Sequence, residues 1–568
     1  SEEERFSRKK HDSGFPKNAI RFVLEEAKIS AGDIDQIIFY EKPFLKFERI
    51  FKTVLATFPF APRVFAEGIK GFFVDKLWIR QLISKELSVP SEKIFFSEHH
   101  LSHAAAGFFC SPYKKAAILT VDGVGEWACT TIGVGEENGI KILKEIRFPH
   151  SLGLLYSALT AFLGFEVNEG EYKVMGMAPY GKPRYTEKVR KLIRFFDDGS
   201  FALNLEYFAF HRSTSRAYSG KFLELFGEPR DPKSKFFTRE SGWPSYFGPK
   251  PEGAEFERLA DKQEYYADLA ASLQAVLEEG VVRLAKEAKK ITGCDKLCVA
   301  GGVWLNSVAN WKILKQAGFS ELFIQPAAGD AGGALGAALA FYHLKLGKPR
   351  GFVMEHAYYG KGYTDSEVLD FLKKEKIPYT HYPEEGKLID VTVSALLAGK
   401  VVGWFQGKFE WGPRALGNRS ILADARRTDM KDIVNTKIKF REPYRPFAPS
   451  VLAEHVEEFF EIENPASHSP ARFMLYVVPV KEEKKKVIPA ITHVDGTGRL
   501  QVVLKEHSPR YWNLIKAFAD KTGVPLVLNT SFNLKGEPVV NTPAEAFSTF
   551  SRSGMDVLVL NNFVVEKK

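Results

Sequence analysis

The sequence has little cysteine and no long apolar run, and both absences exclude classes of protein. Four cysteines among 568 residues do not make a disulfide framework. Cys294 and Cys298 stand four apart without a second pair, which does not match the ligand spacing of a zinc site. The most apolar stretch, residues 391–404, is interrupted by Lys400 and is too short to cross a bilayer, and no stretch resembles a signal peptide. We therefore expect a cytoplasmic chain with no membrane partner.

The sequence also lacks a large excess of charge of either sign. The 79 Lys and Arg residues exceed the 70 Asp and Glu residues by 9, a mild excess that suits anionic metabolites such as nucleotides as well as it suits nucleic acid. The densest basic run, residues 484–486, has no interleaved aromatics and is typical of a solvated turn. Neither a stacking ladder nor a recognition-helix pattern is evident, so we expect no nucleic-acid partner.

The chain is long enough for two to four domains, and its pattern of elements indicates an α/β fold. Residues 116–121 read as a buried strand, and 296–300 and 322–324 read as two more, each followed by a glycine turn. Between them an amphipathic pattern from about Gln263 to Lys290 predicts a helix that Gly293 ends. Strand, glycine turn and helix in repetition predict ligands at the ends of the strands.

A second α/β unit follows a glycine-rich linker, with strands predicted over 401–405 and 526–528. The segment from Tyr207 to Phe247 is aromatic and irregular, which is unusual inside a compact domain, so it is a candidate for contacts with an acceptor. The predicted organisation is a first domain over 1–346, a linker over 347–365 and a second domain over 366–568.

Two histidines and two aspartates form a candidate metal site. His99 and His103 stand four apart at the start of a helical pattern that Ser97 is placed to cap, so they share one helix face. Asp122 and Asp330 each follow a predicted strand beside glycines. Two imidazoles and two carboxylates suit iron(II), manganese or zinc. The competing interpretation is a polar helix start whose histidines have no ligand.

Three glycine turns at strand ends form a candidate nucleotide cleft. Glycines let backbone N–H groups approach a phosphate closely, and a helix that opens beside them favours anions. Each turn alone is equally consistent with a simple hairpin. Asn306 and Asn310 share one helix face and could read a ribose or an adenine edge. The three turns lie at 122–126, 300–302 and 329–333, and the candidate contacts are Gly123, Gly125, Gly301, Gly302, Asn306 and Asn310.

The second half of the chain carries cations in turn-rich segments. Arg414 and Arg419 lie in one such turn, and Lys439-Phe440-Arg441 alternates, so in an extended segment both of its cations would point to one side. Arginine forks suit bidentate capture of phosphate, and Ser and Asn donors suit a small planar group such as a carbamoyl. Scattered surface arginines in ion pairs are the alternative. The remaining candidates are Arg445, Arg499, Ser531 and Asn533.

Two longer motifs carry a resemblance to a known family. These are Glu171-Tyr172-Lys173-Val174-Met175-Gly176-Met177-Ala178-Pro179-Tyr180-Gly181 and Gly412-Pro413-Arg414-Ala415-Leu416-Gly417-Asn418-Arg419. Together with the sites above, the chain resembles over nearly its whole length the O-carbamoyltransferases of the NodU/CmcH type, which modify nodulation factors, cephamycins and aminoglycosides.

The resemblance implies a fold and a division of labour. The first domain would have an actin/hexokinase-like ATPase fold and the second a YrdC-like α/β fold. The second domain would form carbamoyl adenylate from carbamoyl phosphate and ATP, with Mg²⁺, at Lys439, Arg441, Arg499, Ser531 and Asn533. The first would transfer the carbamoyl group to the hydroxyl of a small-molecule acceptor at a divalent metal, Fe²⁺ by resemblance, held by His99, His103, Asp122 and Asp330. Nucleotide contacts would come from the glycine turns, Asn306, Asn310, Arg414 and Arg419, with Lys10 on the AMP phosphate.

One departure from the family pattern concerns the N-terminus. The family has a β-hairpin before the Glu2-Glu3-Glu4-Arg5-Phe6 segment, in which this sequence starts. We expect transfer to be impaired without the hairpin while adenylate formation continues. Two other functions stay open, a tRNA-modifying transferase of the threonylcarbamoyl type and a nucleotide-binding regulatory protein.

Overall fold

The computed structural model describes residues 1–57, 78–244, 247–442 and 444–567, which form two compact units. An N-terminal unit comprises 28–240 and 250–354, and a C-terminal unit comprises 1–27, 241–249 and 355–568. The main division falls close to the predicted linker. Residues 1–27 and 241–249 group with the C-terminal unit and not with the first domain predicted over 1–346. Within the described ranges, no helix has the length and apolar character needed to span a bilayer.

A five-stranded mixed sheet forms the centre of the N-terminal unit. Its order is β5 (Gly139–Arg147), β4 (Ala128–Glu136), β3 (Lys115–Val121), β8 (Lys296–Ala300) and β9 (Glu321–Phe323). The first three strands pair antiparallel, whereas β3, β8 and β9 pair parallel. The carboxyl ends of these parallel strands therefore meet at one edge of the sheet. The three strands expected here are confirmed within one residue at each end.

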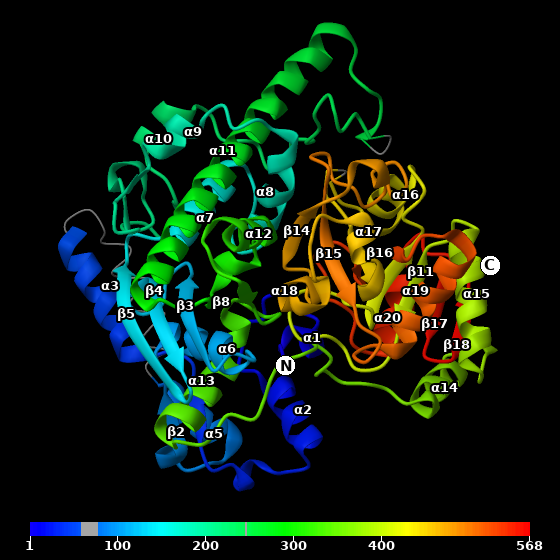
Figure 1. The fold of residues 1–568 in the computed structure, drawn as a ribbon, viewed down its shortest axis with the longest axis horizontal. Helices are drawn as coiled ribbons and strands as arrows, with labels where there is room; N and C mark the ends of the chain where they lie inside the picture. Colours follow the sequence, from blue (N-terminus) through cyan, green and yellow to red (C-terminus); the bar gives the residue numbers. More distant parts are fainter. Residues whose placement is uncertain (58–77, 245–246, 443, 568) are drawn as a thin grey trace. The chain divides into compact units, whose positions relative to one another are not determined.

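Helices of very different length pack against this sheet. The 40-residue α11 (Gly253–Thr292) runs across β3 and β4 (Figure 1) and ends before Gly293, whose φ of 63° is left-handed. Its end agrees with the prediction, but it begins about ten residues before the predicted start at Gln263. The short α6 (His99–Phe109) packs on β3, β4 and β8 and against α13 (Gly333–Ala340). Small residues let α6 and α13 approach closely, because a Cβ at Gly336 would lie 1.8 Å from the carbonyl oxygen of Ser102.

The rest of the N-terminal unit surrounds this core, and all four cysteines of the chain lie buried in it as free thiols. Its other named helices and strands are β1 (Ile37–Phe39), α3 (Pro43–Thr57), α5 (Ile79–Leu87), β2 (Ile94–Phe96), α7 (Leu152–Phe162), α8 (Glu171–Met177), α9 (Thr186–Arg190), β6 (Ile193–Phe195), β7 (Phe201–Leu203), α10 (Gly220–Phe226) and α12 (Ser307–Gln316).

A nine-stranded mixed sheet forms the centre of the C-terminal unit. Most neighbours in it are antiparallel, with parallel pairs at β17/β11 and β13/β15. The two strands expected from sequence correspond to β11 and β16. The order is β10 (Thr380–His381), β18 (Phe563–Glu566), β17 (Val557–Leu560), β11 (Val402–Phe405), β12 (Arg419–Ala423), β16 (Leu526–Ser531), β13 (Ala448–Leu452), β15 (Thr497–Val503) and β14 (Tyr476–Pro479).

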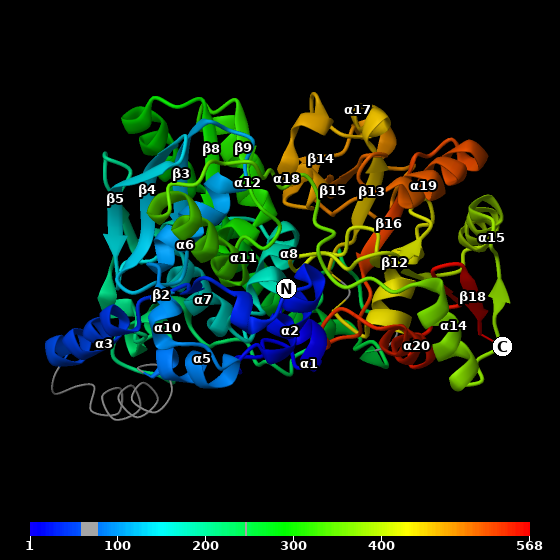
Figure 2. The same cartoon turned by 90° about the horizontal axis from the view of Figure 1, so that it is seen from below.

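Helices cover both faces of this sheet. Figure 2 shows α15 (Glu385–Leu397) and α19 (Pro509–Thr522) on one face, and α14 (Asp365–Lys374) and α20 (Pro543–Ser551) on the other. The core under α15 and α19 includes Trp404, Leu396 and Leu514, all fully buried. The other named helices of this unit are α1 (Glu4–Ser7), α2 (Lys17–Ala27), α16 (Met430–Ile433), α17 (Val456–Phe459) and α18 (Ser469–Arg472).

The first residues of the chain are fixed to the C-terminal unit by two arginines. Arg5 is 1% exposed, and its Nη2 donates to the carbonyl oxygen of Gly412 at 2.9 Å. Arg8 Nη1 donates to the carbonyl oxygen of Val539 at 2.8 Å and lies 3.4 Å from the Glu545 carboxylate. Residues 1–27 are therefore a structural part of this unit.

Two adjacent leucines of α15 test the position of this core. Leu396 is fully buried and Leu397 is 37% exposed. We expect Leu396→Ala to lower the free energy of unfolding of the C-terminal unit by about 2–5 kcal/mol, since it leaves a cavity. Leu397→Ala should cost less than about 1 kcal/mol. Urea denaturation measures both, and equal losses would contradict the assigned helix face.

Candidate functional site

The four predicted metal ligands come together at one edge of the N-terminal sheet. His99 and His103 project from the first turns of α6, Asp122 follows β3, and Asp330 precedes α13. Their ligand atoms all lie within 4.8 Å of one another. The cluster is buried except at Asp330, whose side chain is 61% exposed, so it opens to solvent on one side. The contacts are His99 Nε2 to Asp122 Oδ2 at 3.0 Å, His103 Nε2 to Asp122 Oδ2 at 3.3 Å, His103 Nε2 to His99 Nε2 at 3.1 Å, and Asp330 Oδ1 to His103 and His99 at 3.4 and 3.6 Å.

The carboxylates of Asp122 and Asp330 favour a positive charge at the centre of this cluster. Burial works against charge on His103, yet the hydrogen bonds and charges of Asp122 and Asp330 raise its pKa to about 10. Burial likewise opposes ionisation of Asp122, but its bonds to His103 and His99 hold its pKa well below the usual range. A proton supplies the charge in the absence of an ion, and the imidazole and carboxylate donors fit a divalent transition metal.

His100 lies beside this cluster but has a different role. Its Nδ1 is 2.6 Å from Thr120 Oγ1, which in turn lies 2.6 Å from Thr131 Oγ1. Burial lowers the pKa of His100 to about 3, so the ring is neutral. This bond directs it to β3 and β4, which agrees with the helix-face argument that selected only His99 and His103.

The glycine turns lie around Asp122, as expected, but most are explained by packing. Gly302 N donates to Asp122 Oδ1 at 2.9 Å, and Gly301, at φ 110°, leaves no room for a Cβ because the Val121 carbonyl oxygen would lie 2.2 Å away. A Cβ at Gly125 would meet His100 and His99 at 2.9 and 3.1 Å. Only at Gly123, among the four predicted glycine contacts, is the Cβ position open to 4 Å. Gly123 is therefore the best placed of them to face a ligand.

The two asparagines beside these turns already have partners. Asn306 caps α12 by accepting from Ala309 N at 3.1 Å, and its Nδ2 donates to Gln274 Oε1 at 2.9 Å. Asn310 is fully buried, and its Nδ2 donates to the Trp304 carbonyl oxygen at 2.8 Å. Both asparagines stabilise the fold in the ligand-free chain, so the predicted nucleotide contacts stay a prediction.

A second cluster, in the C-terminal unit, is centred on the buried amine of Lys439. Its Nζ donates to Asn533 Oδ1 at 2.8 Å, to the Asn533 carbonyl oxygen at 3.0 Å and to Ser531 Oγ at 3.2 Å, and it also contacts the Ser531 carbonyl oxygen. Burial, followed by the charges of Arg441 and Arg445, lowers the pKa of Lys439 well below its usual value. The structure thus brings together three of the residues predicted from sequence.

Lys439 and Arg441 belong to one cluster, but not because their segment is extended. Residues Val434–Lys439 form a π-helical turn, and Phe440 has a left-handed φ of 48°. This turn buries Asn435, whose Oδ1 accepts from Arg441 Nε at 2.8 Å and whose Nδ2 donates to the Arg445 carbonyl oxygen at 3.2 Å. No signal in the sequence marked Asn435, since its role depends on the irregular turn.

The other predicted cations have distinct positions. Arg499 lies on β15. Burial, then the charge of Arg445 and then that of Arg499 lower the pKa of Arg441 well below its usual value. Lys10, expected on the phosphate in the first domain, belongs to the C-terminal unit, where its charge adds to those acting on Lys439. Arg414 lies in the loop before β12, where part of its guanidinium is buried.

Arg419 differs most from the prediction. It is fully buried, its guanidinium lies 3.6 Å from the centre of the Phe405 ring, and it donates to carbonyl oxygens that include that of Gln406 at 2.5 Å. The carboxylate of Glu410 binds the same loop by accepting from Leu416 N at 2.7 Å and Asn418 N at 2.9 Å. In this structure Arg419 stabilises the loop and does not present its charge to a phosphate.

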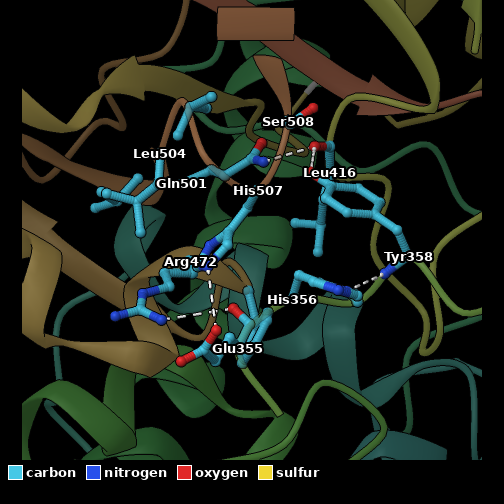
Figure 3. A pocket seen from close by; sticks show the side chains of 13 residues that line it. Glu355, His356, Tyr358, Leu416, Arg472, Gln501, Leu504, His507 and Ser508 are labelled. Atoms are coloured by element: carbon cyan, nitrogen blue, oxygen red, sulfur yellow. Dashed lines mark hydrogen bonds and ion pairs between the residues drawn. The ribbon is translucent and has the colours of Figure 1, made fainter. Parts of the chain in front are cut away.

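A small pocket lies elsewhere in the C-terminal unit, at the start of α19. Figure 3 shows His356 and His507 near its wall with Arg472 and Glu355. The ring centres of the two histidines are 6.0 Å apart, and His507 Nε2 lies 3.8 Å from the Glu355 carboxylate. Burial lowers the pKa of both histidines. None of the residues predicted from sequence as site residues lines this pocket.

Comparison with known families accounts for both halves of the sequence. Residues 1–339 match the carbamoyltransferase N-terminus and residues 393–567 match the carbamoyltransferase C-terminus. The chain belongs to the carbamoyltransferase family. The resemblance drawn from the two motifs is thereby confirmed, and so is the expectation of a transferase enzyme.

Several curated relatives of this carbamoyltransferase cover the whole chain. Protein sll1178 of Synechocystis sp. is 42% identical over 601 residues, covering 100% of this chain and 92% of its own. Nodulation protein NolNO of Sinorhizobium fredii is 37% identical over 576 residues, which cover 100% of this chain and 77% of NolNO. A relative that matches only part of the chain is the 3'-hydroxymethylcephem-O-carbamoyltransferase of Streptomyces clavuligerus. It is 36% identical over 245 residues, which cover 43% of this chain and 44% of the relative.

The solved structure of HypF adds nothing to this assignment. HypF of T. kodakarensis is 17% identical with a TM-score of 0.24, covering 47% of this chain and 38% of its own. A likeness at that level carries no argument about fold or activity. The mixed α/β class expected from the sequence therefore rests on the two sheets described above.

The pKa of His103 gives a testable pH dependence in metal-free protein. Because folding raises this pKa from about 6.5 to about 10, the imidazolium stabilises the folded chain fully below pH 6.5, and the effect is lost as the pH rises through about 10. With a chelator present, the stability gap between the wild type and His103→Gln should be largest near pH 6 and should shrink toward pH 10. Thermal denaturation across this range measures the gap, and a gap independent of pH would contradict the assignment.

Proposed function

We propose that this carbamoyltransferase forms carbamoyl adenylate from carbamoyl phosphate and ATP and transfers the carbamoyl group to a hydroxyl of a small-molecule acceptor. The observation that carries the proposal is the Lys439 amine, which is buried in a member of this family beside Ser531, Asn533 and Arg441. The relative from Streptomyces clavuligerus is named as an O-carbamoyltransferase of a hydroxymethylcephem, and that name supports a hydroxyl acceptor.

The adenylating half-reaction is assigned to the C-terminal unit, as a YrdC-like module. Water cleaves the C–O–P link of carbamoyl phosphate to give carbamate and phosphate, and a carbamate oxygen then displaces pyrophosphate from the α-phosphorus of ATP. Both substrates are polyanions that repel one another, so a site for them needs fixed cations. Mg²⁺ would accompany the ATP phosphates.

Lys439 is suited to this step because its charge responds to anions. In the ligand-free chain, burial and neighbouring arginines disfavour its protonated form. A bound phosphate would supply the compensating charge and favour the ammonium. Arg441 and Arg499 add guanidinium groups whose planar donors match phosphate oxygens. Ser531 and Asn533 hold the Lys439 amine. Ser531 Oγ donates to Asn533 Oδ1 at 2.7 Å and Asn533 Nδ2 donates to the Glu537 carbonyl oxygen at 2.6 Å, so Ser531 would have to exchange its partner to donate to the planar carbamoyl group.

The transfer half-reaction is assigned to the N-terminal unit, as an actin/hexokinase-like module. His99, His103, Asp122 and Asp330 would hold a divalent metal, Fe²⁺ or another transition metal, which would polarise the carbamoyl oxygen and neutralise charge on the departing AMP. Gly123 leaves open space beside Asp122 for the phosphate. The acceptor oxygen bonds to the carbamoyl carbon as the bond to AMP breaks, and the hydroxyl proton is released to solvent, giving a carbamate ester, AMP and a proton.

We assign contacts with the acceptor to an aromatic, irregular segment of the chain. The segment from Tyr207 to Phe247, expected to contact it, includes α10 and long stretches without regular structure. Ser245 and Tyr246 of this segment lie outside the described residues. Phe208, Phe222 and Phe237 are buried in the N-terminal unit, so much of its aromatic content supports the fold.

The adenylating half-reaction can be tested by following pyrophosphate release. Wild-type protein with ATP and Mg²⁺ should release pyrophosphate only when carbamoyl phosphate is present. Lys439→Ala should reduce the rate at least about a hundredfold, in the range of losing a charged transition-state contact. Lys437→Ala, an exposed lysine on the same turn, is the matched control and should retain the wild-type rate. Release without carbamoyl phosphate would favour a nucleotide-binding regulatory protein.

The transfer half-reaction can be separated from the first by a variant of the histidine cluster. His103→Ala should keep pyrophosphate release that depends on carbamoyl phosphate and should lose carbamoylation of hydroxyl-bearing sugars or cephems. Mass spectrometry of the acceptor measures this. The exposed His381→Ala should behave as wild type. Loss of both half-reactions in His103→Ala, with the protein folded, would refute the division of labour.

A further inference from the structure

The histidine helix α6 begins without a cap from its own chain segment. Its first residue is His99, and the preceding Glu98 makes no capping bond with its side chain. Ser97, expected from sequence to cap this helix, instead donates to the carbonyl oxygen of Glu98 at 3.4 Å. The first N–H groups of a helix need acceptors, above all where the helix end is buried, as it is here.

Glu126, from the turn between β3 and β4, supplies that acceptor. Its Oε1 and Oε2 accept from His99 N at 3.0 and 3.2 Å. The same Oε1 accepts from Lys42 N at 2.7 Å, at the start of α3. Glu126 is 6% exposed, so this carboxylate is shielded from water and its bonds to N–H groups are strong.

The turn that carries Glu126 also carries a predicted ligand. Asp122 stands four residues earlier, at the end of β3, and contacts both histidines. Gly125 lets the turn pack directly on His99 and His100, and Arg49 Nη1 holds the turn by donating to the Gly125 carbonyl oxygen at 3.1 Å. One five-residue turn therefore supplies an oxygen ligand at its first residue and fixes the histidine helix at its last.

We infer that Glu126 is a positioning residue of the metal cluster, which sets where His99 and His103 stand relative to Asp122 without touching the metal. The inference rests on the metal site of the proposed function. Without the Glu126 carboxylate, α6 keeps its packing on β3 and α13 but loses the contact that fixes its first turn. Because His99 is the first residue of that turn, its ligand nitrogen is the atom most affected.

A Co²⁺ titration tests this role through the absorption band of the bound ion and its dissociation constant. Glu126→Ala should weaken Co²⁺ binding about tenfold or more, in the range found for residues that orient metal ligands. Glu126→Gln keeps the volume and one acceptor for His99 N–H, so its affinity should fall between those of Glu126→Ala and the wild type. The matched control is Glu136→Ala, at the far end of β4 with a side chain that is 61% exposed, which should bind as wild type.

Each outcome of the titration decides a separate point. Wild-type affinity and spectrum in Glu126→Ala would overturn the inference, even if its melting temperature falls, since Glu126 would then be a structural cap alone. If Glu126→Ala fails to fold, unchanged affinity in Glu126→Gln would overturn it equally. No Co²⁺ binding by the wild type, or equal binding by His103→Ala, would instead refute the proposed metal site, and the inference with it.

Discussion

The arrangement of the N-terminal unit depends on burying two imidazoles beside carboxylates. Such a cluster is unstable unless a positive charge sits within it, which is why the pKa of His103 rises while that of Asp122 falls. The surrounding structure serves to hold this cluster: α6 is fixed between the sheet and α13, and glycines admit the turn after β3. The same need for positive charge suits the cluster to a divalent metal, and the role in transfer proposed above rests on that.

The candidate site of the C-terminal unit has the opposite charge, because it gathers buried cations. It buries a lysine amine among guanidinium groups, and the cost of gathering like charges is offset in part by the oxygens of Ser531 and Asn533 and by the carboxylates of Glu537 and Glu442. A buried group of cations of this kind suits anionic ligands. The two units therefore carry complementary electrostatics, one that requires a cation and one that requires polyanions, and this agrees with a reaction that consumes ATP before it transfers a neutral carbamoyl group.

The sequence predicted those parts of the site whose positions depend on spacing within one helix or strand. The i, i+4 relation of His99 and His103 and the strand before Asp122 predicted that these side chains come together, because helix and strand geometry fix those positions. It could not predict that Arg419 turns inward onto Phe405, since its partners are backbone carbonyls distant in sequence. Nor could it assign a role to Glu126, because the helix start that Glu126 caps lies 27 residues earlier in the chain.

The central claim is that the C-terminal unit makes an adenylate for the N-terminal unit to use. The most direct measurement incubates His103→Gln with ATP and ¹³C-labelled carbamoyl phosphate and analyses the quenched mixture by mass spectrometry. The account predicts carbamoyl adenylate that carries the label, accumulating because transfer is blocked. Its absence from both the variant and the wild type, with ATP shown to bind, would contradict the account.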